Sequence, residues 1–141
     1  KNNCSEDLIR SRLLHDHGHF IINDPNKEDR NKIDGSHEII GANYLKSFFS
    51  DKIIKPILLH VDAKRFLAMN KKYVNNLSKA SKVSLKLQGG IMKAKEAKNF
   101  VKNKNFKDAI KLRRFDEGAK KTNIKIKKIE DYKELLISKI I

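Results

Sequence analysis

The sequence contains no tryptophan, a single cysteine and no long apolar run. A membrane-spanning helix needs about 20 consecutive apolar residues, so we expect no membrane span, and no signal-peptide pattern opens the chain. Cys4 has no second cysteine with which to form an internal disulfide. A chain without disulfides is typical of a reducing compartment, and we therefore expect a cytoplasmic location.

Proline and glycine are also scarce, with two and six occurrences in 141 residues. A chain of this length fits one domain. Apolar residues recur at helical spacing through most of it, whereas alternation of apolar and charged residues occurs only in 124–129, which we interpret as a loop. The sequence therefore predicts an all-α fold in which residues 1–141 form a single domain.

Short polar links separate the predicted helices. Ser5 and Ser36 stand where N-caps are expected, and the segment 20–35 contains two turn signals. Pro56 is expected in the first turn of a helix, and Gly89-Gly90 is expected to end one. The helices are predicted at 5–17, 36–49, 56 to beyond 66, 71–77, 80–88, 93–102, 107–120 and 130–140.

Positive charge dominates, since 32 Lys and Arg stand against 17 Asp and Glu, for a net charge of +15. Such a charge favours an anionic partner. However, lysines occur in every stretch, and aromatic residues, which usually accompany basic residues in nucleic-acid modules, make up only 7% of the chain. We interpret the charge mainly as compositional bias that would still draw small anions to a cleft, and we expect no nucleic-acid partner.

The histidines are concentrated in the first 60 residues, at positions 15, 17, 19, 37 and 60. Asp16 follows His15 directly, and imidazole nitrogen beside carboxylate oxygen suits iron, manganese or zinc. His15 and His19 are four residues apart, so on one continuing helix they would share a face. A His-Asp pair is common by chance, and alone it is equally compatible with a polar helix end.

Two later histidines strengthen the interpretation as a metal site. His37 follows a predicted cap, so its ring would project from a first helical turn. His60 lies in the apolar stretch 56–61, where a lone histidine is usually a core residue. Lys64 follows one turn later on the same face. A cation in that place would hold an anion next to a metal.

The late segment Leu112–Glu117 combines basic and acidic residues on a predicted helix. Asp116 follows Arg113 by three residues, so the two share a face. Arg114 and Glu117 are interpreted as part of an exposed, ion-paired face. The placement of Asp116 beside Arg113 adds to the case for a metal site.

A His-Asp pair, two separate histidines and a late aspartate together resemble the dinuclear HD-domain pattern. More narrowly, the sequence resembles the phosphonate-degrading HD-domain oxygenases, and the most specific blocks are His60–Leu67, Leu87–Met92 and Leu112–Asp116. A generic HD phosphohydrolase is not expected to show all three. Myo-inositol oxygenase, a related dinuclear enzyme, typically has Lys where His19 stands. The resemblance covers most of the chain and implies an HD-domain helical bundle.

The resemblance implies a centre of two iron ions in a mixed-valent Fe(II)/Fe(III) state. The implied ligands of the first iron are His15, Asp16 and Asp116. Asp16 would bridge to the second iron, whose other implied ligands are His37 and His60. The residues implied to hold the phosphonate group are His19, Lys64, Ser81, Ser84 and Arg113. His17 matches no ligand position.

The implied partners are dioxygen and a 1-hydroxyphosphonate that carries an amino or trimethylammonio group. Oxidation would break the carbon–phosphorus bond and release phosphate with glycine or glycine betaine. One alternative is a hydrolytic HD enzyme that uses the metals to activate water against a phosphate ester or nucleotide. A non-catalytic binding module is a second alternative. Dependence on dioxygen separates the oxygenase from the hydrolase, and an iron assay on the purified protein tests the binding module.

One feature departs from the family pattern, in which another histidine ligand of the first iron stands well upstream of the His-Asp pair. Here 14 residues precede His15, none of them is histidine, and the chain begins with Lys. We therefore expect the sequence to be N-terminally incomplete. The choice of phosphonate is expected to depend on residues upstream of it.

Overall fold

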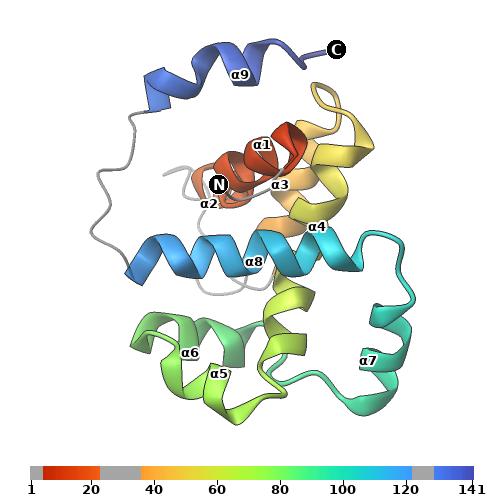
Figure 1. Cartoon of the computed structure of the whole chain (residues 1–141), viewed down its shortest axis with the longest axis vertical. Coiled ribbons are helices and arrows are strands. Elements are labelled where there is room, and N and C mark those ends of the chain that lie inside the picture. The colour runs from red at the N-terminus through yellow and green to blue at the C-terminus, as the bar shows by residue number, and fades with distance from the viewer. Residues whose placement is uncertain (1–4, 23–35, 122–128) are drawn as a thin grey trace.

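The computed structural model describes residues 5–22, 36–121 and 129–141 (Figure 1). All regular elements within these ranges are helical, which confirms the predicted all-α class. None of the described helices has the length and apolar character that crossing a bilayer requires. The turn signals in 23–35, the predicted loop at 124–128 and Cys4 lie outside the described residues.

The first predicted helix is divided in two. Helix α1 spans Glu6–Leu14 and α2 spans His17–Ile22. The predicted cap is present, because the side chain of Ser5 accepts a hydrogen bond from the backbone of Leu8 at 3.3 Å. The expectation of one helix over 5–17 is wrong, so His15 and His19 do not share a helical face. Helix α2 packs instead on α3, which spans His37–Leu45, and this places His19 beside His37.

Helix α4 spans Asp51–Leu67 and begins five residues before the predicted start. Pro56 therefore lies inside the helix and not in its first turn, which corrects the prediction. A proline in this position removes one backbone hydrogen bond. Burial offsets that loss, since Ile53 and Ile57 on either side are fully buried at 0% exposure.

The remaining elements lie close to their predicted ranges. Their bounds are α5 Lys71–Asn76, α6 Lys79–Leu87, α7 Ala94–Val101, α8 Phe106–Lys121, the 3₁₀ helix η1 Ile129–Tyr132 and α9 Lys133–Ile137. Gly89 and Gly90 follow α6 with φ values of 97° and 73°. Glycine adopts this left-handed region without a Cβ penalty, so the pair ends α6 as predicted.

Helix α4 is the central element and packs against α1, α3 and α8 (Figure 1). One core cluster joins α3 to the first half of α4 and ends at Ile57. A second cluster begins at Ala63 and joins the end of α4 to α7 and α8. His60 lies on α4 between the two clusters, so apolar packing on both sides fixes the helix that carries it.

A buried arginine fastens α9 to α1. Arg10 is 1% exposed, and its side chain donates to the carbonyl of Leu135 at 2.7 Å and to the hydroxyl of Ser138 at 3.2 Å. On the next residue of α1, the hydroxyl of Ser11 donates to the carbonyl of Ile53 on α4 at 2.8 Å. Helix α1, which ends next to His15, is thus held by two other helices.

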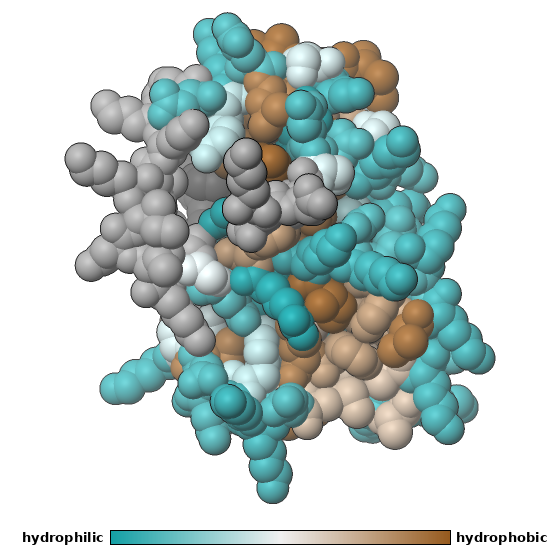
Figure 2. Space-filling model, viewed as in Figure 1, coloured by the Kyte–Doolittle hydropathy of each residue, from teal (hydrophilic) through white to brown (hydrophobic). Residues whose placement is uncertain are grey.

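Hydrophilic residues are spread over the face of the molecule shown in Figure 2, with apolar residues exposed between them. They are not gathered in a single stripe on this face. This distribution agrees with the even spread of lysine along the sequence.

Candidate functional site

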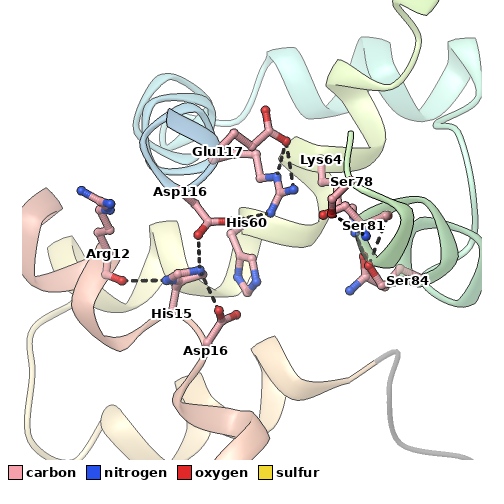
Figure 3. A network of polar contacts seen from close by, with 12 residues as sticks. Arg12, His15, Asp16, His60, Lys64, Ser78, Ser81, Ser84, Asp116 and Glu117 are labelled. Atoms are coloured by element: carbon pink, nitrogen blue, oxygen red, sulfur yellow. Dashed lines mark hydrogen bonds and ion pairs between the residues drawn. The ribbon is translucent and has the colours of Figure 1, made fainter. Parts of the chain in front are cut away.

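The structure brings the five predicted metal ligands together from separate elements. Figure 3 shows four of them, His15, Asp16, His60 and Asp116. Helices α1, α3, α4 and α8 contribute, together with the link between α1 and α2. The residues are His15 at the end of α1, Asp16 in the link, His37 at the start of α3, His60 in the middle of α4 and Asp116 on α8.

The first group of potential ligands surrounds the ring of His15. Its Nε2 lies 3.2 Å from Oδ2 of Asp16 and 3.5 Å from Oδ1 of Asp116. Its Nδ1 donates to the carbonyl of Arg12 at 2.6 Å, which fixes the ring with Nε2 towards the carboxylates. That Nε2 is buried and makes no hydrogen bond of good geometry with the described residues. A metal ion at this point would satisfy it.

The second group surrounds His37 and His60, whose Nε2 atoms are 3.0 Å apart. His60 Nδ1 lies 2.6 Å from the carbonyl oxygen of Ile57, which requires the proton on Nδ1 and leaves a lone pair on Nε2. His37 Nε2 is 3.8 Å from Oδ1 of Asp16. One oxygen of Asp16 therefore faces the first group and the other faces the second, as a bridging carboxylate requires.

His19, an expected phosphonate contact, lies beside two of the candidate metal ligands. Its ring stacks on that of His37 with centroids 3.9 Å apart, and its Nε2 is 4.0 Å from Oδ1 of Asp16. The ligand atoms of His19, Asp16 and His37 lie within 4.8 Å of one another. The geometry thus suits His19 as a metal ligand as well as a substrate contact. His17 packs against Tyr44 instead, with ring centroids 5.4 Å apart.

Burial and the charges within the cluster shift the pKa values of three of its residues. Burial lowers the pKa of His15, but its contacts with Asp116 and Asp16 outweigh burial and raise the pKa to about 9. Burial raises the pKa of the Asp16 carboxyl, yet the contact with His15 brings it below its usual range. Burial and the neighbouring His15 charge lower the pKa of His60. The two carboxylates beside His15 thus favour positive charge at this point, which a bound metal cation would supply.

A pocket of about 480 Å³ opens onto the cluster. Its lining includes all of the predicted ligands except His15, and all of the predicted phosphonate contacts. Those contacts are His19 on α2, Lys64 on α4, Ser81 and Ser84 on α6, and Arg113 on α8. The structure therefore places a set of cationic and hydroxyl groups beside the candidate metal centre.

Lys64 is 4% exposed, and residues in and directly after α6 orient its ammonium group. Its Nζ donates to the hydroxyl of Ser84 at 2.6 Å and to the side-chain oxygen of Gln88 at 3.1 Å. The hydroxyl of Ser84 in turn lies 3.2 Å from the carbonyl of Ser81. Gln88 was not among the predicted contacts, although the Leu87–Met92 block that contains it was a signal.

Arg113 is 5% exposed and has three oxygen partners. Its guanidinium lies 2.9 Å from Oδ2 of Asp116, 2.9 Å from Oε1 of Glu117 and 3.2 Å from the hydroxyl of Tyr73. The prediction that Glu117 belongs to an exposed face is wrong, because its side chain is 18% exposed and pairs with Arg113. Arg114 is exposed as expected. No sequence signal pointed to Tyr73.

Glu38 is a second buried acid that the sequence did not reveal. It is 7% exposed, and its Oε2 lies 3.6 Å from Nδ1 of His37. Burial raises the pKa of this carboxyl. Its place next to a candidate ligand in the sequence was the available signal.

Helices α2 and α3 approach each other through glycine. A Cβ atom on Gly18 would lie 1.8 Å from the carbonyl oxygen of His37, and one on Gly41 would lie 2.9 Å from the backbone nitrogen of Gly18. Only glycine at Gly18 permits this backbone contact. The contact brings the following residue, His19, over the ring of His37.

Comparison with curated proteins found two phosphonate dioxygenases. The chain is 38% identical over 133 residues to hydroxymethylphosphonate dioxygenase of Gimesia maris, covering 93% of this chain and 66% of that protein. It is 42% identical over 130 residues to 1-hydroxy-2-(trimethylamino)ethylphosphonate dioxygenase (glycine-betaine-forming) of Leisingera caerulea, covering 88% and 64%.

An uncharacterised protein of Acanthamoeba polyphaga mimivirus is 35% identical over 134 residues, which is 93% of this chain and 61% of that protein. The chain thus spans less than two thirds of the length of these relatives. No protein-family model matches it.

Proposed function

Since this chain belongs to the family that includes the phosphonate dioxygenases of Gimesia maris and Leisingera caerulea, we propose that the protein is a di-iron oxygenase that breaks the carbon–phosphorus bond of a small 1-hydroxyphosphonate. The observation that carries the proposal is the position of Asp16, whose two oxygens face two histidine groups beside a pocket that contains buried cations. We further propose that residues 1–141 form one domain.

We assign the first iron to His15, Asp16 and Asp116, and the second to Asp16, His37 and His60. Three features support this assignment: the buried Nε2 of His15, the main-chain hydrogen bonds that orient His15 and His60, and the shared carboxylate of Asp16. Imidazole and carboxylate ligands suit iron. When bound, iron supplies the redox chemistry with dioxygen that amino acid side chains lack.

The pocket residues would hold the phosphonate group. A dianionic head group needs several donors in a buried site, and Lys64 is oriented for this role by Ser84 and Gln88. Ser81, Arg113 and His19 line the same pocket. Held there, the hydroxyl-bearing carbon of the substrate would share the pocket with the candidate ligands. These contacts would also exclude water from the anion.

The reaction consumes dioxygen in proportion to the phosphonate. Both atoms of dioxygen are incorporated as the carbon–phosphorus bond breaks, which leaves a carboxylate and inorganic phosphate. With an amino or trimethylammonio substituent, the carboxylate product is glycine or glycine betaine. The simplest substrate of this class is hydroxymethylphosphonate, which carries no nitrogen.

The test uses protein expressed from its complete reading frame and loaded with Fe(II). With hydroxymethylphosphonate or 1-hydroxy-2-aminoethylphosphonate, we expect dioxygen uptake and phosphate release in equal amounts, and no release under anaerobic conditions. An oxygen electrode and a phosphate assay measure both. Absence of uptake with each 1-hydroxyphosphonate would contradict the proposal. Phosphate release from a phosphate ester without dioxygen would identify a hydrolase instead.

Replacing Lys64 by methionine is expected to weaken phosphonate binding. The variant loses a charge-assisted contact worth about 1.5–3 kcal/mol, so we expect KM to rise by about 10- to 100-fold while bound metal is unchanged. Steady-state kinetics and metal analysis test this. Lys86→Met is the matched control, because Lys86 is an exposed residue on neighbouring α6. Equal KM values for the two variants would remove Lys64 from the phosphonate site.

A further inference from the structure

We propose that Tyr73 and Glu117 are positioning residues that determine how Asp116 presents its carboxylate to the metal centre. They would act through Arg113, the residue that contacts all three. The inference rests on the proposed function, because it takes Asp116 as a metal ligand. Neither Tyr73 nor Glu117 lines the pocket, so their effect would be indirect.

The contacts form a continuous chain from α5 to the metal centre. The hydroxyl of Tyr73 donates to Oε1 of Glu117. That same oxygen lies 3.1 Å from Nε and 2.9 Å from NH2 of Arg113. On its other side, Arg113 donates through NH1 to Oδ2 of Asp116 at 2.9 Å.

The planar guanidinium transmits orientation from one carboxylate to the other. Because the group is rigid, fixing Nε and NH2 on Glu117 also fixes the direction of NH1. NH1 donates a hydrogen bond to Oδ2 of Asp116, and the other oxygen, Oδ1, lies 3.5 Å from Nε2 of His15. Asp116 would therefore bind a metal through a single oxygen.

Without Glu117, the guanidinium could rotate and engage both oxygens of Asp116. Arginine and carboxylate readily form such bidentate pairs, and the pair would compete with the metal for Asp116. The interaction would be strong, since Arg113 and Asp116 are only 5% and 8% exposed. The contact between Arg113 and Glu117 prevents this rearrangement.

Tyr73 has a separate task. It comes from α5 and not from α8, which carries the other three residues. The Glu117 side chain is 18% exposed, so a partner from a second helix keeps it from turning towards solvent. Helix α5 is also followed directly by α6, which carries Ser81 and Ser84. Tyr73 thus joins the phosphonate side of the pocket to the metal side.

The experiment measures the affinity of the protein for Fe(II) by competition with a coloured chelator, and the thermal stability of the metal-free protein. For Tyr73→Phe and Glu117→Gln we expect metal affinity to fall by about 10- to 100-fold, as is usual for partners of metal ligands. Tyr73→Phe keeps both charges, so the melting temperature of the metal-free protein should be unchanged in that variant. Glu117→Gln should lower it, because a buried arginine loses a charge partner. Glu96→Gln is the matched control, because it weakens a similar pair with Arg65 outside the pocket.

The outcomes separate the two proposals. A wild-type protein that binds no iron would overturn the proposed function itself. Wild-type protein that binds iron, with both variants equal to Glu96→Gln, would overturn the positioning role alone. A lower affinity of Tyr73→Phe that is matched by a lower melting temperature of the metal-free protein would also overturn it, because Tyr73 would then act on the fold and not on Asp116.

Discussion

Replacing Asp16 by asparagine is expected to abolish dioxygen consumption and to remove iron from both sites. The two oxygens of Asp16 face separate histidine groups, so one substitution affects both. An amide is a poor substitute, because it carries no charge and its nitrogen does not bind a cation. Loss of a residue that only hydrogen-bonds to a metal ligand already costs about 10- to 100-fold in metal affinity or activity. We expect loss of the shared ligand to exceed about 100-fold.

Metal analysis of the purified variant and an oxygen electrode measure these effects. Asp62→Asn is the matched control, because Asp62 lies on α4 near His60, pairs with Arg65 and has a side-chain exposure of 43% against 51% for Asp16. It should retain iron and activity. An Asp16→Asn protein with the iron content and turnover of wild type would remove Asp16 from the centre, and with it the central support for two irons.

Replacing Gly18 by alanine is expected to separate α2 from α3. The new Cβ would lie 1.8 Å from the carbonyl oxygen of His37, and backbone atoms cannot yield as a flexible side chain can. We expect the free energy of unfolding to fall by about 3 kcal/mol, at the upper end of typical overpacking costs. Iron affinity should fall as well, since His19 would no longer stack on His37.

Chemical denaturation of the metal-free protein measures the change in stability. Gly118→Ala is the matched control, because a Cβ at this position in α8 would meet, among the described residues, no atom of another element within 4 Å. Alanine inside a helix is more stable than glycine by about 0.5–1 kcal/mol, so this variant should gain stability. If both variants changed stability in the same direction, the close approach at Gly18 would not be a requirement of the fold.

Helices with clear local signals were predictable from the sequence. Gly89-Gly90 marked the end of α6, and Ser5 marked the start of α1, because caps and left-handed glycines act within a few residues. The break between α1 and α2 was not predictable. Helix α2 packs on α3 through Gly18, and that contact exists only after the chain has folded. The position of Pro56 inside α4 was not predictable either, because the helix accommodates the proline through burial of its neighbours.

The candidate ligands were assigned through the family resemblance, which the curated relatives confirm. Their roles stay predictions. The supporting residues were harder to recognise. Gln88 lay in a block that the resemblance singled out, and Glu38 follows a candidate ligand, but no role could be assigned to them or to Tyr73 from the sequence. Each matters because of the partner that it contacts on the folded chain.

The amino-acid sequence by itself determined the all-α class, the family and the residue types that could bind metal and anion. Periodicity, capping and motif spacing are local properties, so they can be recognised before folding. Only the tertiary structure decided that Asp16 faces two histidine groups and that Arg113 is shared between Asp116 and Glu117. These arrangements depend on distances between helices far apart in the sequence, and packing around α4 sets those distances.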